Sequence, residues 1–447
     1  MFERKKIFIL GMARSGYEVA KVLSKKNKVI INDLNDKQDI KNVNELKRLK
    51  VEVILGYHPE NIIDESIDYI IKNPGIRNDH QYVKRAIELN IPVINEVEVA
   101  YLLLPKDVYI IGITGSNGKT TTTTIIYEFL KEAKKRVHLG GNIGIPFSKL
   151  LKDIKSKDIL VLEISSHQLC NFDKFKTNMS LLLNLYETHL DFFKDYEDYI
   201  NTKKRIFNHH TKSDIAIFNC ENKDVVKAIS DIMSEKECFS VNNENVNGAY
   251  IKDEYIYFLK EKIIKLDEIL IKGKHNYENI LAAVIVAKKL GVDNSIIQKV
   301  LKTFKGVEHR IEYVKEFNNR KIYNDSKSTN IMATKTALNS FEKNIILLLG
   351  GLDRGQSFDE LKEYKEKIKF VVCYGETKKR IKGFCDNANI LCYEEDNLEK
   401  TTKKAYLLSS EGDVILLSPA CASWDQFKDF EERGKKFKEY INKLEEL

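Results

Sequence analysis

Several features of secreted and membrane-spanning proteins are missing from this sequence. It has six prolines and no low-complexity tract, so it lacks the composition of a linker or stalk. Its seven cysteines are scattered, odd in number and without a C-x-x-C pair, which excludes a disulfide framework or zinc ribbon and favours a reducing compartment. The longest apolar run that we find, Ile280 to Ala287, is far shorter than the ~20 residues of a membrane span.

A secretory signal is also missing. The apolar stretch before Gly11 covers Ile7 to Leu10, whereas a signal peptide needs about 7–15 apolar residues. We therefore expect a cytoplasmic protein without a membrane span.

The sequence has no large excess of charge of one sign. Lys and Arg total 73, Asp and Glu total 66, and the two signs are interleaved, which leaves a net charge of +7. Nucleic-acid-binding domains concentrate their cations in a stripe or patch, so we expect no nucleic-acid partner. Small anionic ligands fit the mild positive bias equally well.

The 447 residues suggest about three domains, and short apolar runs alternate with helical periodicity in three blocks. This alternation predicts an α/β fold with parallel sheets covered by helices. The blocks are 1–96, 97–305 and 306–447. Strands are expected at 6–10, 29–33, 51–55, 68–71, 92–95, 108–113, 158–163, 180–185, 215–219, 321–324, 344–349, 370–374 and 414–417. Helices are expected at 15–25, 119–134, 276–290 and 425–447, and a hairpin or meander at 249–266.

A first glycine loop follows the first predicted strand. Gly11-Met12-Ala13-Arg14-Ser15-Gly16 is a relaxed dinucleotide fingerprint, in which glycines let the backbone approach a phosphate at a helix N-terminus. Asp33 ends the next strand, where an acid can accept a hydrogen bond from a ribose or base. The loop is equally compatible with a tight turn that binds nothing, and it does not specify the nucleotide.

A second glycine loop reads T-G-S-N-G-K-T-T over 114–121. Lys119 can reach the β- and γ-phosphates of a nucleotide, and the hydroxyl of Thr120 can bind Mg²⁺. Ile113 stands where the strict P-loop has glycine. We nevertheless predict a triphosphate site, because a plain polar turn does not explain Gly-Lys-Thr between a strand and a helix.

Other candidates have two interpretations each when taken alone. Glu163 ends a predicted strand, where α/β enzymes hold metal-bound phosphate, but it could equally form a surface ion pair. His189 could be a structural histidine with its hydrogen bonds satisfied, but its position between Glu187 and Asp191 after another predicted strand favours a functional role. Lys203 begins Lys-Lys-Arg, which is also compatible with a solvated helix face. Asn276 and Asn279 are three residues apart and share the first turns of a helix, where they could bind adenine or ribose, or Asn276 could cap the helix.

Together these motifs resemble the Mur ligases, ATP-dependent enzymes that build the peptide of bacterial cell-wall precursors. Besides the ATP loop, the matching motifs are G-G-N-I-G at 140–144, E-x-S-S-x-Q at 163–168, Y-x-x-x-K at 199–203, G-x-H-N-x-x-N-x-L-A-A at 273–283 and H-R-x-E at 309–312. The resemblance covers nearly the whole chain. It implies a Rossmann-like N-terminal domain for the UDP substrate, a central P-loop-type ATPase domain, and a Rossmann-like C-terminal domain for the amino acid.

The last block resembles the branch of the family that adds D-glutamate. Its motifs are N-D-S-K-S-T-N at 324–330, G-G-L-D-R at 350–354 and S-P-A-C-A-S-W-D-Q-F at 418–427. The blocks D-N-P-R and G-H-H-P, which mark other branches, are missing there. The resemblance implies ATP-dependent addition of D-glutamate to UDP-N-acetylmuramoyl-L-alanine through an acyl phosphate, in the synthesis of peptidoglycan precursors.

The resemblance also implies roles for single residues. The catalytic residues would be Lys119, Glu163, His189 and Lys203. Two Mg²⁺ sites would use Thr120, Glu163, His189 and Lys203, the last as a carbamate. ATP would contact Gly115, Ser116, Asn117, Gly118, Lys119, Thr120, Thr121, Asn276, Asn279, Arg310 and Asp325. The UDP substrate would contact Arg14, Ser15, Gly16, Asp33, Asn73, Pro74, Gly75, Asn142, Ser165 and Gln168. D-glutamate would contact Lys327, Thr329, Arg354, Ser423 and Phe430.

Four other functions stay open from the residues. A folylpolyglutamate synthase is the nearest, although the motifs of the last block disfavour it. A nicotinamide oxidoreductase would use the first glycine loop but leaves Lys119 unexplained. A P-loop kinase would need no amino-acid site, and a non-catalytic nucleotide-binding protein would need neither Glu163 nor His189. For the ligase that the resemblance implies, we expect a monomer.

Overall fold

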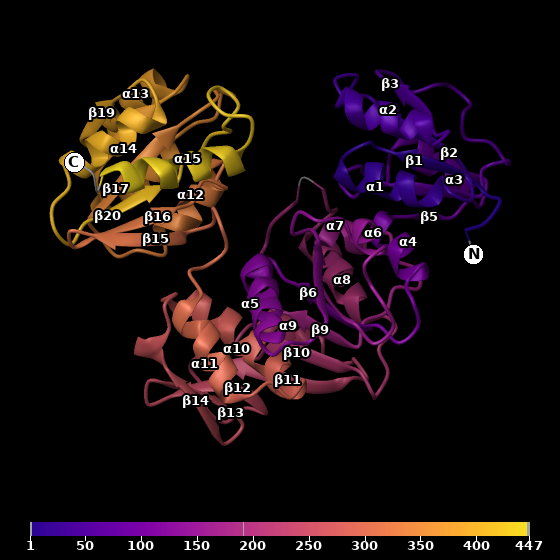
Figure 1. Ribbon diagram of the computed structural model, residues 1–447, viewed down its shortest axis with the longest axis horizontal. Helices are drawn as coiled ribbons and strands as arrows, with labels where there is room; N and C mark the ends of the chain where they lie inside the picture. The colour runs from indigo at the N-terminus through magenta and orange to yellow at the C-terminus, as the bar shows by residue number, and fades with distance from the viewer. Residues whose placement is uncertain (1, 191, 445–447) are drawn as a thin grey trace. The chain divides into compact units, whose positions relative to one another are not determined.

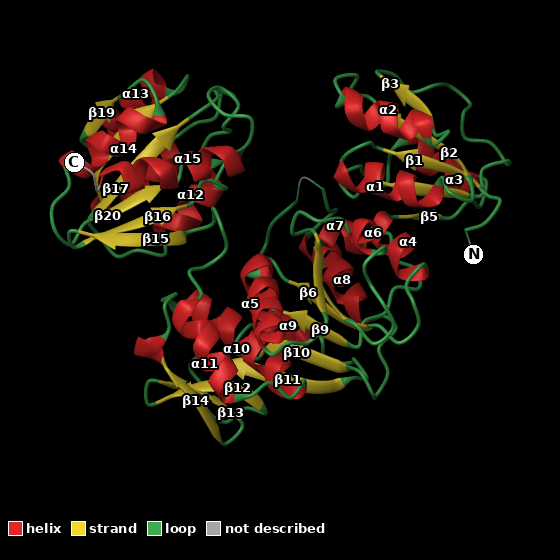
Figure 2. Ribbon diagram, in the orientation of Figure 1, coloured by secondary structure: helices red, strands yellow, loops and turns green. Residues whose placement is uncertain are grey.

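The computed structural model describes residues 2–190 and 192–444. Contacts divide the chain into two compact units, Met1–Thr303 and Phe304–Leu447. Within the described residues, the strands form two sheets in the first unit and one in the second (Figures 1 and 2). Each sheet carries helices on its faces, so the α/β class is confirmed.

The first sheet is parallel throughout, in the strand order β3-β2-β1-β4-β5. Its strands are β1 (Lys6–Leu10), β2 (Lys28–Asp33), β3 (Glu52–Leu55), β4 (Tyr69–Lys72) and β5 (Val93–Ile94). The helices α1 (Arg14–Leu23) and α2 (Ile40–Arg48) cover one face and α3 (Gln81–Glu88) the other. The carboxyl ends of β1, β2 and β4 therefore meet at one edge, where sheets of this type bind ligands.

The second sheet has the order β14-β13-β12-β11-β10-β9-β6-β8-β7 and is parallel from β12 to β7. Its strands are β6 (Tyr109–Thr114), β7 (Val137–Gly141), β8 (Ile159–Glu163), β9 (Met179–Leu182), β10 (Ile215–Asn219), β11 (Glu235–Ser240), β12 (Gly248–Lys252), β13 (Tyr255–Phe258) and β14 (Glu261–Lys265). The last three form the expected antiparallel meander.

Helices cover both faces of the second sheet. One face packs against α4 (Glu96–Leu102), α6 (Phe147–Leu150), α7 (Ser166–Leu169), α8 (Tyr196–Lys204), the short η1 (Arg205–Phe207) and α9 (Lys223–Ala228). The other face carries α5 (Lys119–Glu132), α10 (Lys274–Lys289) and α11 (Asn294–Thr303), after the short η2 (Leu266–Glu268). The apolar run 280–287 is the buried part of α10. Because α10 packs against both α5 and the sheet, apolar residues on more than one side of it are buried.

The third sheet has the order β15-β16-β20-β17-β18-β19, with β15 antiparallel to β16 and the other pairs parallel. Its strands are β15 (Glu312–Phe317), β16 (Arg320–Asn324), β17 (Ile345–Gly350), β18 (Ile368–Tyr374), β19 (Cys392–Glu394) and β20 (Val414–Leu417). One face packs against α12 (Ile331–Leu338), η3 (Asp359–Lys367) and α13 (Lys378–Ala388), and the other against α14 (Leu398–Leu407) and α15 (Phe430–Lys443).

The structure corrects some expected elements. The final helix begins at Phe430, not Asp425, because Asp429 caps it through the N–H of Glu432; its expected end at 445–447 lies outside the described residues. The strands β7, β11, β15 and β19 were not predicted. β7 includes two glycines and β11 begins with three charged residues, so neither has a clear apolar pattern.

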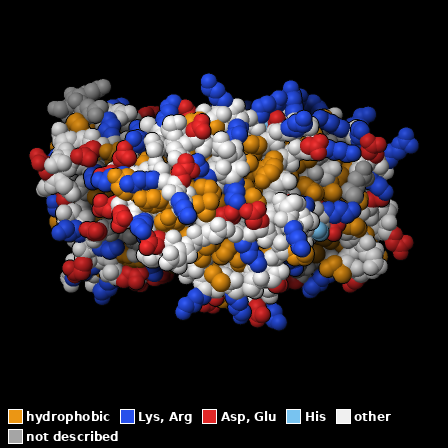
Figure 3. Space-filling model, turned by 90° about the horizontal axis from the view of Figure 1, so that it is seen from below, with side chains coloured by type: hydrophobic (Ala, Val, Ile, Leu, Met, Phe, Trp, Pro, Cys, Tyr) orange, Lys and Arg blue, Asp and Glu red, His pale blue; other side chains and the backbone are white. Residues whose placement is uncertain are grey.

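The surface agrees with the interleaved charges of the sequence. Figure 3 shows Lys and Arg side chains mixed with Asp and Glu over much of the face that it presents. Among the described residues, none of the helices combines the length and the apolar composition that crossing a bilayer requires.

Candidate functional site

A glycine-rich loop joins β6 to α5. Gly118 precedes α5 at φ 82°, and a side chain at this position would lie 2.1 Å from Oδ1 of Asn279, so glycine is needed there. The N–H of Ser116 donates to the carbonyl oxygen of Asn184 (3.0 Å), and the N–H of Asn117 donates to Oδ1 of Asn184 (2.8 Å). The loop and the positive end of α5 together form an element suited to binding an anion.

Two lysines meet at this loop. Nζ of Lys119 donates to the carbonyl oxygen of Gly115 at 2.8 Å, and Nζ of Lys203 donates to the same oxygen at 2.9 Å and to Oγ1 of Thr114 at 3.3 Å. Lys203 lies on α8 and is 1% exposed. Burial, and then the charge of Lys119, lowers the pKa of Lys203 well below its usual value, while Glu163 acts in the opposite direction.

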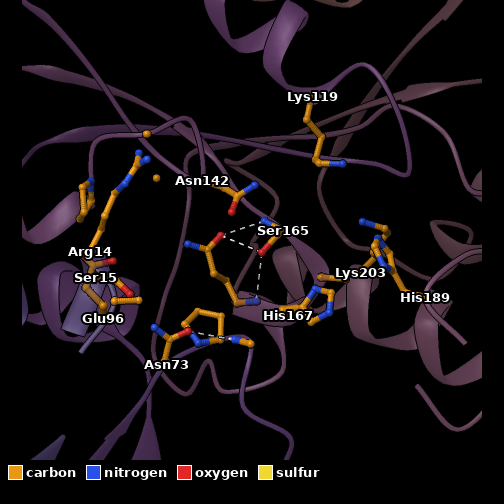
Figure 4. Close-up of a pocket in the computed structure, with 18 of the residues that line it drawn as sticks. Arg14, Ser15, Asn73, Glu96, Lys119, Asn142, Ser165, His167, His189 and Lys203 are labelled. Carbon is orange, nitrogen blue, oxygen red and sulfur yellow. Dashed lines mark hydrogen bonds between the residues drawn. The ribbon is translucent and has the colours of Figure 1, made fainter. Parts of the chain in front are cut away.

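Parts of the first unit that are far apart in the sequence line one cavity of about 550 Å³. Of the predicted catalytic residues it is lined by Lys119, His189 and Lys203. Of the predicted substrate residues it is lined by Arg14, Ser15, Asn73, Pro74, Gly75, Asn142, Ser165 and Gln168. Figure 4 shows Arg14 and Ser15 at one side of the view, the three catalytic candidates at the other, and Asn142 and Ser165 between them. The volume is in the range of small-molecule sites.

Glu163 ends β8 beside this cavity and is 2% exposed. Its Oε1 accepts a hydrogen bond from Nδ2 of Asn142 at 3.0 Å, whereas Oε2 is buried without a hydrogen-bond partner. A buried carboxylate oxygen without a partner is unfavourable unless a cation lies beside it. Glu163 therefore fits a ligand of Mg²⁺, which prefers oxygen.

The described residues limit how such a metal site can be built. His, Cys, Asp and Glu side chains alone form no group of three among them that could hold a metal ion. Further oxygen ligands would have to come from a hydroxyl such as that of Thr120, which is buried at the second position of α5, or from a carboxylate formed on Lys203. Glu163 and Thr120 thus offer oxygen ligands of the kind that Mg²⁺ prefers, and a carboxylate formed on Lys203 would add another.

His189 has a left-handed backbone, with φ 59°, which few residues other than glycine adopt. Its carbonyl oxygen accepts from the N–H groups of Phe192 (2.9 Å) and Phe193 (3.0 Å), so a tight turn follows it. Its ring packs edge-to-face against that of His167, with the centroids 5.1 Å apart. Asp191, the second acid of this motif, lies outside the described residues.

Three features of the cavity wall were missed in the sequence. Ser165 and Gln168 form a capping box at the start of α7, in which Oε1 of Gln168 accepts from the N–H of Ser165 at 2.9 Å. The S-x-x-Q spacing predicts this arrangement. His167 and Glu96 also line the cavity. Burial raises the pKa of Glu96 to about 7, and its carboxylate accepts from the N–H of Ser148.

A second cavity, of about 320 Å³, lies where the strands of the first sheet end. It is lined by Leu10, Gly11, Ala13, Asn32, Asp33, Leu34, His58, Asn73, Ile76 and His80. Ala13 and Asn73 line both cavities, so the two adjoin. Oδ2 of Asp33 accepts from the N–H of Met12 at 2.6 Å, which holds the glycine loop against the end of β2.

The predicted contacts that line neither cavity include Gly16, Asn276 and Asn279. Gly16 is among the lining residues of neither; a side chain there would lie 1.9 Å from the carbonyl oxygen of Gly11, so glycine lets α1 pack against the turn. Asn279 packs against the loop at Gly118 and accepts from Oγ1 of Thr122 at 3.2 Å. Asn276 donates instead to the carbonyl oxygen of Lys272 at 2.8 Å, and Gly273, not Asn276, caps α10.

In the second unit, the segment after β16 meets the start of α15. Oγ of Ser326 donates to the carbonyl oxygen of Phe430 at 2.8 Å, and Nζ of Lys327 lies 5.9 Å from the centre of the Phe430 ring. The N–H of Thr329 donates to the carbonyl oxygen of Lys327 at 3.0 Å. Three of the five predicted D-glutamate contacts are thus brought together.

The other two predicted contacts, Arg354 and Ser423, lie near Trp424. The guanidinium of Arg354 lies 4.6 Å from the centre of the Trp424 ring, and Ser423, which is buried, precedes that tryptophan. Both groups belong to loops at the carboxyl ends of strands, Arg354 after β17 and Ser423 after β20. Neighbouring parallel strands place these loops at one edge of the sheet.

Asp325 is buried between these segments. Its carboxylate accepts from Oγ of Ser418 at 2.7 Å and from the N–H of Ile311 at 3.2 Å. Burial raises its pKa to about 6, although these hydrogen bonds and the charge of Arg310 act against the shift.

Arg433 is a further residue that sequence analysis did not place in the site. It lies on α15, is fully buried and donates to Oγ (3.0 Å) and the carbonyl oxygen (2.8 Å) of Ser326 and to the carbonyl oxygen of Cys421 (3.0 Å). It therefore joins the segment of Lys327 to that of Ser423. An arginine spaced along a predicted charged helix looks like a surface residue in the sequence.

Three family models match the chain. The model for the Mur ligase MurD-like N-terminal domain matches residues 5–95, that for the Mur ligase middle domain matches 113–287, and that for the Mur ligase glutamate ligase domain matches 309–421.

Curated relatives match over nearly the full length. A UDP-N-acetylmuramoylalanine–D-glutamate ligase of Geobacillus sp. (strain WCH70) is 45% identical over 446 residues, covering 99% of this chain and 98% of the relative. The corresponding ligase of Bacillus thuringiensis (strain Al Hakam) is 43% identical over 445 residues with the same coverage.

Solved structures show the same fold at lower identity. The UDP-N-acetylmuramate–alanine ligase MurC of Thermotoga maritima superposes with a TM-score of 0.62 at 19% identity, covering 99% of this chain and 100% of that one. The MurF ligase of Thermotoga maritima, solved in complex with ADP, gives a TM-score of 0.58 at 19% identity, with 99% of each chain covered.

Proposed function

This chain belongs to the Mur ligase family, and we propose that it adds D-glutamate to UDP-N-acetylmuramoyl-L-alanine in an ATP-dependent reaction. The full-length identity of 43–45% to ligases named for this reaction supports the assignment. The observation that carries it is the single cavity lined both by Lys119 of the phosphate loop and by the residues of the first glycine loop. A phosphate donor and a nucleotide-linked acceptor could meet there.

We assign one ligand to each block of the chain. Residues 1–96 bind the UDP end of the substrate, 97–305 bind ATP, and 306–447 bind D-glutamate. The adjoining cavities support the first assignment, since a nucleotide in the smaller cavity can extend past Ala13 and Asn73 into the larger one. Arg14, Ser15, Pro74, Gly75, Asn142, Ser165 and Gln168 then line the path toward the reacting carboxylate.

In the first step the carboxylate of the L-alanyl residue attacks the γ-phosphorus of ATP. The bond from this phosphorus to the bridging oxygen breaks, ADP leaves, and an acyl phosphate forms. Phosphoryl transfer needs positioning and neutralisation of charge more than covalent catalysis. We assign Lys119 and the N–H groups of the loop to neutralising the phosphates, with Asn279, Arg310 and Asp325 as further contacts of ATP.

We propose Mg²⁺ as the metal, at two sites. The partnerless Oε2 of Glu163 supports a cation beside it, and Thr120, His189 and carbamylated Lys203 would complete the ligands. When bound, Mg²⁺ neutralises charge on the phosphate oxygens. Burial that favours the neutral amine of Lys203 supports the carbamate, because a protonated amine cannot attack CO₂.

In the second step the amine of D-glutamate attacks the acyl carbon. A tetrahedral intermediate forms, the carbon–oxygen bond to phosphate breaks, and the amide remains after the nitrogen loses a proton. We assign Lys327 and Arg354 to the carboxylates of D-glutamate, because cations bind such groups through charge-assisted hydrogen bonds. Thr329, Ser423 and Phe430 would fix its orientation.

The relatives do not favour the other candidate functions, including folylpolyglutamate synthase. An oxidoreductase also leaves the phosphate loop without a role. We further propose that the protein acts as a monomer in the cytoplasm, where ATP and nucleotide-linked precursors are available. Its product is then a precursor for peptidoglycan synthesis, which serves cell shape and division.

Phosphate release tests the proposed reaction. Purified protein is given ATP, Mg²⁺ and UDP-N-acetylmuramoyl-L-alanine, with D-glutamate, with L-glutamate or with neither. We expect phosphate release and a new amide, identified by mass, with D-glutamate alone. Release that ignores D-glutamate, or that is equal with L-glutamate, would overturn the assignment.

A further inference from the structure

Four hydrogen bonds form a chain along one wall of the smaller cavity. Nδ2 of Asn32 donates to the carbonyl oxygens of Ile54 (3.1 Å) and Tyr57 (2.8 Å), and Oδ1 of Asn32 contacts Nδ1 of His58. Nε2 of His58 lies 3.3 Å from Nε2 of His80. The chain continues from His80 into the first turn of α3.

The groups at the two ends of this hydrogen-bond chain determine where each proton lies. Carbonyl oxygens only accept, so the amide of Asn32 has one possible orientation and its Oδ1 must accept from Nδ1–H of His58. At the other end, the backbone N–H of Tyr82 donates to Nδ1 of His80 at 3.2 Å. Nδ1 of His80 is therefore bare, and its proton lies on Nε2, from which it is donated to Nε2 of His58. Both rings are neutral, with opposite tautomers.

This chain of bonds connects three segments that form the cavity. Asn32 is the last but one residue of β2, His58 lies in the loop after β3, and His80 caps α3. The two rings pack edge-to-face with centroids 5.0 Å apart, and Oη of Tyr82 donates to the carbonyl oxygen of Pro59 at 2.6 Å. Asn32, His58 and His80 all line the cavity that also contains Asp33.

We propose that His58 and His80 are positioning residues for the UDP end of the substrate, and that substrate binding requires both imidazoles to be neutral. The proposal rests on the proposed function, which places UDP in this cavity. All four nitrogen atoms of the two rings are engaged in hydrogen bonds within the protein. The rings therefore act indirectly, by holding the cavity wall in position.

A single added proton disrupts this chain of hydrogen bonds. A proton on Nε2 of His58 would face Nε2–H of His80, so His80 would have to move its own proton to Nδ1, where the N–H of Tyr82 already points. The N–H of Tyr82 at the start of α3 would then lose its acceptor, so the cavity wall loosens in either case. Protonation therefore weakens binding, although an imidazolium by itself would attract the diphosphate.

The surrounding charges agree with neutral rings. Burial lowers the pKa of His58, and Asp33 opposes this shift. Burial, His58 and Lys72 lower the pKa of His80, and Asp79 opposes. Since both values lie below the usual 6.5 of histidine, the neutral state holds at pH 7, and protons are taken up as the pH falls below about 6.5.

Calorimetric binding of UDP-N-acetylmuramoyl-L-alanine to the full chain between pH 5.5 and 8.0 tests the proposal. The diphosphate of this probe is a diester, so it does not titrate in this range. We expect the wild type to lose affinity as the pH falls from 7.5 toward 5.5. His80→Asn keeps an acceptor for the N–H of Tyr82 and cannot be protonated, so we expect it to weaken binding at pH 7.5 and to flatten the pH profile. ATP binding should not change.

His209→Gln is the matched control, since His209 is exposed and lies outside both cavities. It should retain the wild-type profile. A wild-type affinity that is constant or rises toward pH 5.5, or a His80→Asn profile equal to that of the wild type, would overturn the proposal while leaving the ligase assignment intact. Failure of the probe to bind at any pH would instead contradict the proposed function.

Nitrogen NMR of the imidazoles provides a readout that a general loss of stability would not move. We expect Nδ1–H for His58 and Nε2–H for His80 at pH 7.5, and loss of both signatures together at low pH. The same tautomer in both rings would contradict the hydrogen-bond chain.

Discussion

Lys119 and Lys203 donate to the same carbonyl oxygen, that of Gly115, at 2.8 and 2.9 Å. Two ammonium groups this close repel each other, and burial together with this repulsion lowers the pKa of Lys203 well below its usual value. Lys119 of the phosphate loop and Lys203 of α8 thus meet at one oxygen, which agrees with their proposed roles as a cation for phosphate and an amine for reaction with CO₂.

The first prediction concerns Lys203. We expect Lys203→Met to lower kcat at least about a hundredfold, because it removes both the amine and the carboxylate that would form on it. The wild type should lose activity in CO₂-free buffer and regain it with bicarbonate. Lys204→Met is the control, since Lys204 faces outward and pairs with Asp231. Activity of Lys203→Met near the wild-type level would rule out the carbamate.

The second prediction concerns Glu163. We expect Glu163→Gln to raise the Mg²⁺ concentration needed for half-maximal activity at least about tenfold, because an amide oxygen binds Mg²⁺ more weakly than a carboxylate. The amide can still accept from Asn142, so the thermal midpoint should change little. Glu132→Gln, at the exposed end of α5, serves as the control in the same Mg²⁺ titration. An unchanged Mg²⁺ dependence would remove Glu163 from the metal site.

The third prediction concerns Lys327. Lys327→Ala should raise KM for D-glutamate about tenfold or more and leave ATP binding within about twofold, because it removes a cation that would pair with a carboxylate. Steady-state kinetics with each substrate varied in turn measures both effects. Lys343→Ala, an exposed lysine before β17, should change neither. Equal losses for D-glutamate and ATP would count against the assigned role.

The fourth prediction concerns Arg433. We expect Arg433→Met to lower the free energy of unfolding of the second unit by about 3 kcal/mol, because three buried acceptors on Ser326 and Cys421 lose their donor. Denaturant unfolding measures this loss. Lys436→Met, exposed on the same helix and paired with Glu439, should cost less than about 0.5 kcal/mol. A similar small loss at Arg433 would show that the buried bonds contribute little.

The fifth prediction follows from Asp325. Its pKa, raised to about 6, means that the folded state prefers the protonated acid. This preference stabilises the fold fully below about pH 3.8 and is lost as the pH rises through about 6. The stability of Asp325→Asn relative to the wild type should therefore increase between pH 5 and 7, by at most about 3 kcal/mol. Denaturant midpoints at several pH values test this, and a flat difference would contradict the raised pKa.

Much of the fold could be predicted from local patterns. Strong apolar strands such as β1 and β20, and the glycine-delimited start of α5, are expected within a residue or two of where they lie. The missed strands β11 and β19 have mixed patterns, and they form because a neighbouring strand offers a ladder of hydrogen bonds. The start of α15 was misplaced because Asp425 and Asp429 are both acceptable caps in sequence.

The sequence motifs identified residues of the site but not how these residues are arranged in space. Spacing pointed to Lys119, and the family resemblance pointed to Glu163 and Lys203. Neither could show that Lys203 is buried or that Oε2 of Glu163 lacks a partner. The sequence assigned no role to Arg433 or His80, because their importance comes from contacts with groups more than 20 positions away.

The sequence by itself determined the class of the fold and the residue types at the phosphate loop, because these depend on periodicity and short spacings. Its motifs also carried the resemblance to the family. The tertiary structure determined the burial, the neighbouring charges and the hydrogen-bond partners of those residues. Burial lowers the pKa of Lys203 below that of an ordinary lysine. Packing places the first glycine loop and the phosphate loop on one cavity. A chain of hydrogen bonds assigns opposite tautomers to two histidines. Desolvation and hydrogen-bond direction depend on neighbours distant in sequence, so no local pattern contains them.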